Sequence, residues 1–214
     1  MNTTTTTTTT QTTHAAPTFD DLFKAGPDPW NQEHSWYEAR KRDLLLAALP
    51  QQHYRSAFEP GCASGFLSEH LARRVDRLLA WDTSARAVAY AAERLHTQPH
   101  AQAAHGQVPQ HWPTGPFDLI VLSEVLYYLP DGDIQQVADQ ASATLRAFGA
   151  HATLVACHWL QPFSGAPAGG AAVHALLHDR LQLPRVAQWR DDDFCLDVWS
   201  TETRSLAQQE RRRE

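Results

Sequence analysis

The chain has 214 residues with 24 acidic and 18 basic side chains, and its formal net charge is −6. This length suits one domain of ordinary size, and the negative charge argues against nucleic acid as the main ligand, because phosphate binding needs a concentrated positive surface. The apolar runs are too short to cross a bilayer, and no signal-peptide pattern is present. The cysteines Cys62, Cys157 and Cys195 form no disulfide framework. We expect a cytoplasmic protein, either a monomer or a homodimer, without a membrane or nucleic-acid partner.

Composition divides the chain into three parts. Residues 1–18 contain a run of threonines with nothing to bury, so disorder is the expectation there. We expect a single domain with an N-terminal cap helix over residues 19–203, followed by a charged tail over residues 204–214. Within the domain, Pro27 and Pro29 interrupt the first segment, 19–30, which is predicted to be irregular.

Hydrophobic periodicity predicts strands and helices that alternate from residue 34 to residue 156. The predicted helices cover 34–49, a segment after Gly65, 84–95, 132–146 and 173–181. The predicted strands cover 56–59, 78–82, 100–108, 117–122, 150–156, 185–190 and 194–200. This alternation predicts an α/β fold, a doubly wound sheet of seven mostly parallel strands with an antiparallel C-terminal hairpin. A ligand is expected at the carboxyl ends of the strands.

A loop of small residues, Glu59-Pro60-Gly61-Cys62-Ala63-Ser64-Gly65, joins the first predicted strand to a helix. Small residues let the backbone approach a ligand, and the helix that follows offers free N–H groups. Asp82 ends the next strand, where a carboxylate can accept both hydroxyls of a ribose. Together these features predict a nucleoside-bearing cofactor across the ends of the first two strands.

The charge of this loop indicates which cofactor it holds. The dinucleotide pattern G-x-G-x-x-G is absent, because the only glycines of the loop are Gly61 and Gly65. Glu59 would repel a pyrophosphate, but its carboxylate suits the cationic amino group of an amino acid. This favours S-adenosylmethionine, which carries a ribose and a methionine but no phosphate. An NAD(P)-dependent oxidoreductase and a non-catalytic cofactor-binding module stay open as alternatives.

The sequence resembles the class I S-adenosylmethionine-dependent methyltransferases, and among them most the NodS-type (nodulation protein S) N-methyltransferases. The stretches that carry the resemblance are 28–30, 36–42, 58–65, 80–84, 109–113, 117–129, 157–159 and 193–199. It implies a Rossmann-like methyltransferase fold and N-methylation of a small amine acceptor, such as an amino sugar. Three places depart from the family pattern, and one of them is the turn 147–150, Ala-Phe-Gly-Ala, where the family usually has Pro-Gly-Gly. Ala63 replaces the middle glycine of E-x-G-C-G-x-G, and residues 106–108 stand where an acidic residue often contacts adenine.

The resemblance also implies which residues hold the cofactor. Residues of the first loop border the methionine end of the cofactor, Asp82 holds its ribose, and the N-terminal helix covers the cofactor. The implied cofactor-binding residues are Tyr37, Arg40, Glu59, Gly61, Gly65, Asp82, Thr83, Gln107, Val108 and Ser123.

Catalysis on an amine requires a neutral nitrogen, so a base or a water path must remove a proton. Glu124 and His158, each just past a predicted strand end, are the candidate catalytic residues. Aromatic faces attract sulfonium and ammonium cations, and five aromatic residues are expected near the same opening: Trp36, Tyr37, Tyr127, Tyr128 and Trp159. His174 and His178 have the spacing of a shared metal site, but no third ligand suggests itself, so no metal is expected.

Overall fold

A seven-stranded sheet forms the centre of the molecule in the computed structural model, which describes residues 18–161, 163, 165 and 169–211. The strands are β1 (Ala57–Pro60), β2 (Leu78–Asp82), β3 (Ala101–His105), β4 (Leu119–Ser123), β5 (Thr153–Trp159), β6 (Arg185–Arg190) and β7 (Phe194–Ser200). Their order is β3-β2-β1-β4-β5-β7-β6, and β7 is antiparallel to both of its neighbours while β1 to β5 are parallel. The predicted fold class, including the closing hairpin, is confirmed.

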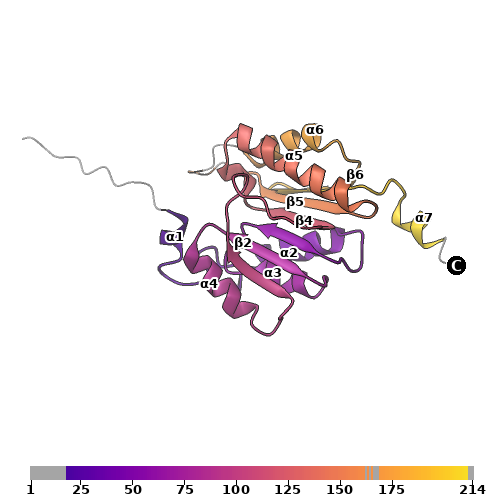
Figure 1. Ribbon diagram of the computed structural model, residues 1–214. Coiled ribbons are helices and arrows are strands. Elements are labelled where there is room, and N and C mark those ends of the chain that lie inside the picture. The colour runs from indigo at the N-terminus through magenta and orange to yellow at the C-terminus, as the bar shows by residue number, and fades with distance from the viewer. Residues whose placement is uncertain (1–17, 162, 164, 166–168, 212–214) are drawn as a thin grey trace, which may run out of the picture.

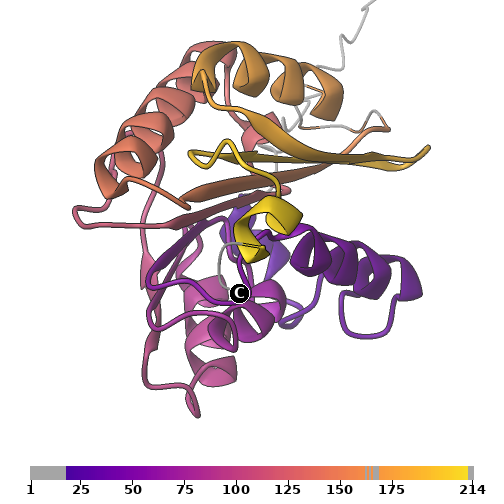
Figure 2. The same cartoon turned by 90° about the vertical axis from the view of Figure 1, so that its right-hand side faces the viewer.

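Helices cover both faces of the sheet (Figures 1 and 2). On one face lie α2 (Trp36–Ala48), α3 (Phe66–Ala72) and α4 (Ala85–Arg94), and on the other lie α5 (Asp131–Phe148) and α6 (Gly170–Leu181). Because both faces are covered, the central strands are apolar on both sides. The first four residues of β4, Leu119 to Leu122, are fully buried. Among the described helices, none has the length and apolarity needed to span a membrane.

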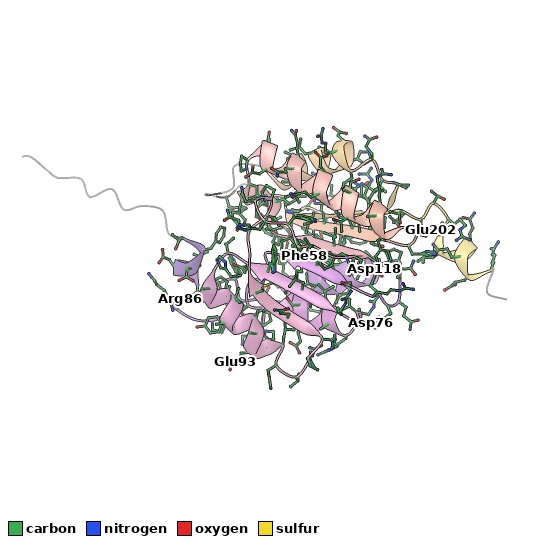
Figure 3. The ribbon with its side chains drawn as sticks, viewed as in Figure 1. Phe58, Asp76, Arg86, Glu93, Asp118 and Glu202 are labelled. Atoms are coloured by element: carbon green, nitrogen blue, oxygen red, sulfur yellow. The ribbon has the colours of Figure 1, made fainter. Side chains whose placement is uncertain are left out.

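Aromatic packing and one carboxylate fix the start and the middle of β1. The Phe58 ring, labelled in Figure 3, is fully buried and meets the rings of Trp81, Trp112 and Phe117 at centroid distances of 5.2–5.5 Å. Just before the start of β1, the backbone N–H groups of residues 55 and 56 donate hydrogen bonds to the Asp118 carboxylate. These contacts hold β1 beside β4 and leave the carboxyl end of β1 free to carry the first loop.

Three local features differ from the sequence prediction. A four-residue helix, α1 (Phe19–Leu22), begins with a capping box at Thr18, in the segment predicted to be irregular. In the charged tail, Ser205 and Gln208 form a second capping box that begins α7 (Leu206–Glu210). Strand β5 continues to Trp159, beyond the predicted end at residue 156. Apart from Thr18, the threonine-rich segment 1–18 lies outside the described residues.

The topology reverses between β1 and β4. The chain moves from β1 outward to β2 and β3 on one side, and from β4 outward to β5 on the other. The carboxyl ends of β1 and β4 therefore meet at a switch point, where the connecting loops diverge and leave room for a ligand.

Candidate active site

A cavity of about 680 Å³ opens at this switch point. That volume falls in the range of small-molecule and cofactor sites. Its walls come from the carboxyl ends of β1, β2, β4 and β5, from α1 and α2, and from η1 (Leu126–Tyr128), a single 3₁₀ turn after β4. Nine of the twelve sequence-predicted site residues line it: Tyr37, Glu59, Gly61, Asp82, Thr83, Gln107, Val108, Ser123 and Glu124.

Two glycines shape the loop after β1. Gly61 has φ +77°, and a Cβ on it would lie 2.8 Å from Cγ2 of Val125, so only glycine fits without a shift. The N–H groups of Gly61 and Cys62 both donate to the carbonyl of Trp81, which ties the loop to the end of β2. Gly65 has φ +80° and begins α3 against the backbone of Ala91. Gly65 therefore supports the loop from behind, and it does not line the cavity.

Ala63 adopts a left-handed conformation, with φ +50°, at the position where the family pattern has glycine. A left-handed conformation costs an L-residue roughly 1–2 kcal/mol. Replacing alanine by glycine also increases the conformational entropy of the unfolded chain, which offsets about 0.4–1 kcal/mol.

We therefore expect Ala63→Gly to raise the free energy of unfolding, by up to about 1 kcal/mol. Urea denaturation measures it. The control is Ala143→Gly at an exposed position inside α5, which should lower the free energy of unfolding by about 0.5–1 kcal/mol. Equal losses in the two variants would show that the backbone at Ala63 is not strained.

Asp82 presents a preorganised carboxylate at the end of β2. Its Oδ2 accepts the N–H of Ala63 at 2.9 Å, and its Oδ1 accepts the N–H of Ser84 at 2.8 Å. Burial raises the pKa of Asp82, and the hydrogen bonds from the backbone N–H groups of Ser84 and Ala63 oppose that rise. Each oxygen keeps a free lone pair, so the carboxylate can accept two further hydrogen bonds from a ligand.

Glu59 is a buried carboxyl group with 2% of its surface exposed. Burial raises its pKa to about 8, although the Ser68 hydroxyl donates a hydrogen bond to Oε2 at 2.6 Å and opposes the rise. Within the described residues, no Lys or Arg forms an ion pair with it. A buried carboxylate without a cation is costly, so this end of the cavity is suited to a positively charged ligand group.

The third strand end offers a shallow wall without charge. A Cβ on Gly106 would lie 2.3 Å from the Trp81 ring, so the backbone passes directly over this indole. Gln107 and Val108 follow and line the cavity. An uncharged wall beside backbone groups is suited to an aromatic base.

Charged side chains cluster around Glu124, just after the end of β4. Its Oε1 accepts a hydrogen bond from the Lys41 ammonium at 2.6 Å, and its Oε2 accepts from the Tyr127 hydroxyl at 2.5 Å and from the Trp159 N–H at 3.0 Å. Lys41 also donates to Glu38 at 3.1 Å. Burial alone would lower the pKa of Lys41, but the two carboxylates outweigh it and raise that pKa. Lys41 is therefore a cation, and it joins α2 to the end of β4.

The segment before α2 closes the cavity on the side of α4. Asp20 accepts hydrogen bonds from the Ser84 hydroxyl at 2.9 Å and from the Arg86 guanidinium at 3.0 Å, and Figure 3 shows Arg86 beside α1. Phe19 and Phe23 consequently line the cavity, together with Trp30. These three aromatic residues were not among the predicted site residues, because nothing in the sequence pattern of 19–30 indicates where that segment docks.

His158 does not reach the cavity, which corrects its assignment as a catalytic candidate. The side chain is fully buried, its Nε2 accepts the N–H of Leu126 at 3.2 Å, and its Nδ1 lies 3.1 Å from Nε2 of His174. Asp197 accepts a hydrogen bond from Nδ1 of His174 at 2.7 Å. Burial, helped by His174, holds the pKa of His158 well below its usual range. Both ring nitrogens are engaged, so this imidazole supports η1 from below.

Two other predicted positions also lie outside the cavity. Arg40 pairs with Asp191 at 2.9 Å and lies over the rings of Trp189 and Phe194, so it docks α2 on the C-terminal hairpin. Trp36 is 75% exposed and does not line the opening. Both residues follow the helical spacing of α2, but they lie on the side away from the cavity.

Sequence comparison relates the chain to one protein family. The family model described as "Nodulation protein S (NodS)" matches residues 20–186. Nodulation protein S of Sinorhizobium fredii is 37% identical over 108 residues, which are 50% of each chain. That of Rhizobium tropici is 34% identical over 123 residues, which are 57% of this chain and 51% of the relative. The chain thus spans about half the length of these curated relatives.

Two solved structures cover more of the chain. A putative methyltransferase from Pseudomonas syringae is 46% identical, with a TM-score of 0.69 over 78% of this chain and 99% of its own. N-methyltransferase NodS from Bradyrhizobium japonicum WM9, solved in complex with S-adenosyl-L-homocysteine, is 27% identical. Its TM-score is 0.72, over 82% of this chain and 93% of its own.

Proposed function

This chain belongs to the nodulation protein S (NodS) family, and from that premise we propose that it is an S-adenosylmethionine-dependent methyltransferase that methylates the nitrogen of a small amine. One observation carries the proposal. The buried, cation-free carboxyl group of Glu59 and the preorganised carboxylate of Asp82 line a single cavity at adjacent strand ends. This pair suits the amino group and the ribose of one S-adenosyl ligand.

Further cavity residues would surround the other parts of this ligand. Gly61 would bring the loop backbone close to the methionine part, while Thr83, Gln107 and Val108 would enclose the adenine. Ser123 and Glu124 would lie beside the sulfonium. When bound, S-adenosylmethionine supplies a methyl group on a positively charged sulfur, and this sulfur keeps the electron pair of the bond that breaks. The protein supplies position, and alignment contributes several kcal/mol to such a transfer.

The acceptor end combines aromatic walls with carboxylates. Tyr37, Tyr127, Trp159 and Phe163 line it, and Glu38 and Glu124 carry two negative charges against one positive charge on Lys41. Aromatic faces and net negative charge attract an ammonium group, and the same faces pack on the apolar face of a sugar ring. A small primary amine, such as an amino sugar, is therefore the acceptor we propose.

Turnover on matched amines tests this function. The full chain should transfer a labelled methyl group from S-adenosylmethionine to D-glucosamine or another member of a primary-amine panel. It should not transfer one to the corresponding N-acetylated compounds, which lack a basic nitrogen. Transfer to both sets equally would indicate that oxygen is the acceptor, and no transfer to any amine would count against the proposal.

The alternative of an NAD(P)-dependent oxidoreductase is disfavoured by Glu59, because a dinucleotide would place its pyrophosphate near the first loop, beside a carboxyl group that pairs with no Lys or Arg within the described residues. A non-catalytic binding module would bind S-adenosylhomocysteine yet show no turnover on the panel. We also place the protein in the cytoplasm as a monomer or homodimer. Its three cysteines are buried and free in the structure, as a reducing compartment allows.

A further inference from the structure

The Glu38 side chain does not make the capping-box hydrogen bond that the local sequence predicts. Ser35-Trp36-Tyr37-Glu38 begins α2 with the capping-box pattern S-x-x-E, in which the glutamate side chain accepts the N–H of the cap residue. The Ser35 hydroxyl does accept the N–H of Glu38, but the N–H of Ser35 donates to the carbonyl of Asn31 instead. Both α1 and α7 close their capping boxes fully. The Glu38 carboxylate gives up this local bond and lines the cavity.

The two carboxylates at the acceptor end differ in their hydrogen bonding. Both oxygens of Glu124 are occupied, by Lys41, Tyr127 and Trp159. Glu38 uses only Oε1, which accepts from Lys41, and its Oε2 makes no hydrogen bond within the described residues. Lys41 is 7% exposed and also lies 5.0 Å from the centre of the Tyr37 ring. Of these two carboxylates, only Glu38 therefore has an oxygen that accepts no hydrogen bond within the described residues.

A second, smaller cavity lies behind the same cluster. It has a volume of about 40 Å³, and it shares Gln32, Glu38, Lys41, Ser123 and Glu124 with the main cavity. This is space for a water molecule or two between the charged side chains and the apolar side chains of Leu45, Phe66 and Leu67. Its wall includes Arg42, whose Nε is buried and has no hydrogen-bond partner within the described residues. The cluster thus lines both the main cavity and this small chamber.

We propose that Glu38 is the catalytic residue that removes the proton from the acceptor nitrogen, and that the small chamber behind it leads this proton away. The inference rests on the proposed function and names the base of that site. The acceptor enters as an ammonium and loses one proton to Oε2 of Glu38. The freed lone pair forms the new bond to the methyl carbon, whose old bond leaves its electron pair on sulfur. Lys41, which is itself held by Glu124, keeps the Glu38 carboxylate in place.

Glu38→Gln tests the assignment, because glutamine keeps the shape and an oxygen for Lys41 but does not accept a proton. The assay uses the fastest acceptor of the primary-amine panel, starting with D-glucosamine. We expect kcat/KM at pH 7 to fall about 100-fold, within the range of general-base catalysis. The dissociation constant for S-adenosylhomocysteine should stay within about twofold. Asp43→Asn is the control, because Asp43 is an exposed acid on the same helix.

The pH profile separates a base from a structural residue. Charged groups around Glu38 come from α2 (Lys41, Arg42) and from the end of β4 (Glu124), and the Tyr37 and Tyr127 hydroxyls also face the cluster. At high pH the acceptor arrives already neutral and needs no base. The defect of Glu38→Gln should therefore shrink to less than about tenfold near pH 9.5, while Glu38→Asp should show an intermediate loss with the same trend.

The possible results distinguish failure of the Glu38 assignment from failure of the proposed function. A defect of equal size at every pH, or no defect, would overturn the assignment of Glu38 and leave the proposed function standing. Absence of turnover by the unaltered chain on every amine would overturn both. If Glu38→Gln loses S-adenosylhomocysteine binding, the test passes to Glu38→Asp, which keeps the charge beside Lys41. A loss for Glu38→Asp that does not change with pH, or no loss, would then refute the inference.

Discussion

Replacing Asp82 with alanine should weaken the binding of S-adenosylhomocysteine by about 10- to 100-fold. A hydrogen bond to a charged group contributes about 1.5–3 kcal/mol, and the carboxylate has a free lone pair on each oxygen for a ribose hydroxyl. The substitution also removes the acceptors for the N–H groups of Ala63 and Ser84. Isothermal titration calorimetry measures the change in the dissociation constant.

Asp76→Ala provides the matched control. Asp76 lies just before β2, as Asp82 lies at its end, and its side chain is 65% exposed in a pair with His53 (Figure 3). We expect the control to leave the dissociation constant unchanged. Asp82→Asn separates the two roles of the side chain, because the amide keeps one acceptor for the loop. An unchanged dissociation constant in Asp82→Ala would show that the ribose does not bind at the end of β2.

Replacing Glu59 with glutamine should weaken S-adenosylhomocysteine binding by a similar factor at pH 8 and abolish its pH dependence. In the free protein, burial raises the pKa of Glu59 to about 8, so the group is mostly protonated at pH 7. Pairing with a cationic amino group requires the ionised form. Affinity should therefore rise by about tenfold per pH unit up to pH 8 and then level off, and binding at pH 7 should release a proton to the buffer.

Calorimetry in two buffers of different ionisation enthalpy detects that proton. The control is Glu93→Gln on the exposed side of α4, which Figure 3 labels far from the sheet. This control should keep both the proton release and the pH dependence. Binding without proton release in the unaltered chain would mean that Glu59 is already ionised, or that it does not meet the amino group.

The fold and the residues at the strand ends that line the cavity were predictable, because strand ends can be located from local patterns. The apolar run before Ser123 indicates a strand buried on both faces, and Glu59 and Asp82 follow shorter apolar runs. In a parallel sheet, residues at successive strand ends must come close together. The predicted ends of the helices and strands were less accurate, and the end of β5 affected the assignment of a site residue. Because β5 continues to Trp159, His158 lies within the strand, and α6 covers it.

The acceptor half could not be predicted in the same way. Glu38 fits a capping box and Lys41 follows it at helical spacing, so local rules assign both to the ends and surface of a helix. Their actual positions depend on how α2 packs over the ends of β4 and β5. That packing is tertiary, and the pattern of residues 36–48 gives only one sign of it. The one signal was the polarity of a helix side that would otherwise be apolar.

Titration of the full chain at pH 8 with S-adenosylhomocysteine, and separately with NAD, tests most directly whether this cavity is an S-adenosylmethionine site. We expect saturable binding of one S-adenosylhomocysteine per chain and no binding of NAD at the same protein concentration. Binding of NAD without binding of S-adenosylhomocysteine, or no heat with S-adenosylhomocysteine at high protein concentration, would contradict the placement of Glu59 and Asp82 around this cofactor.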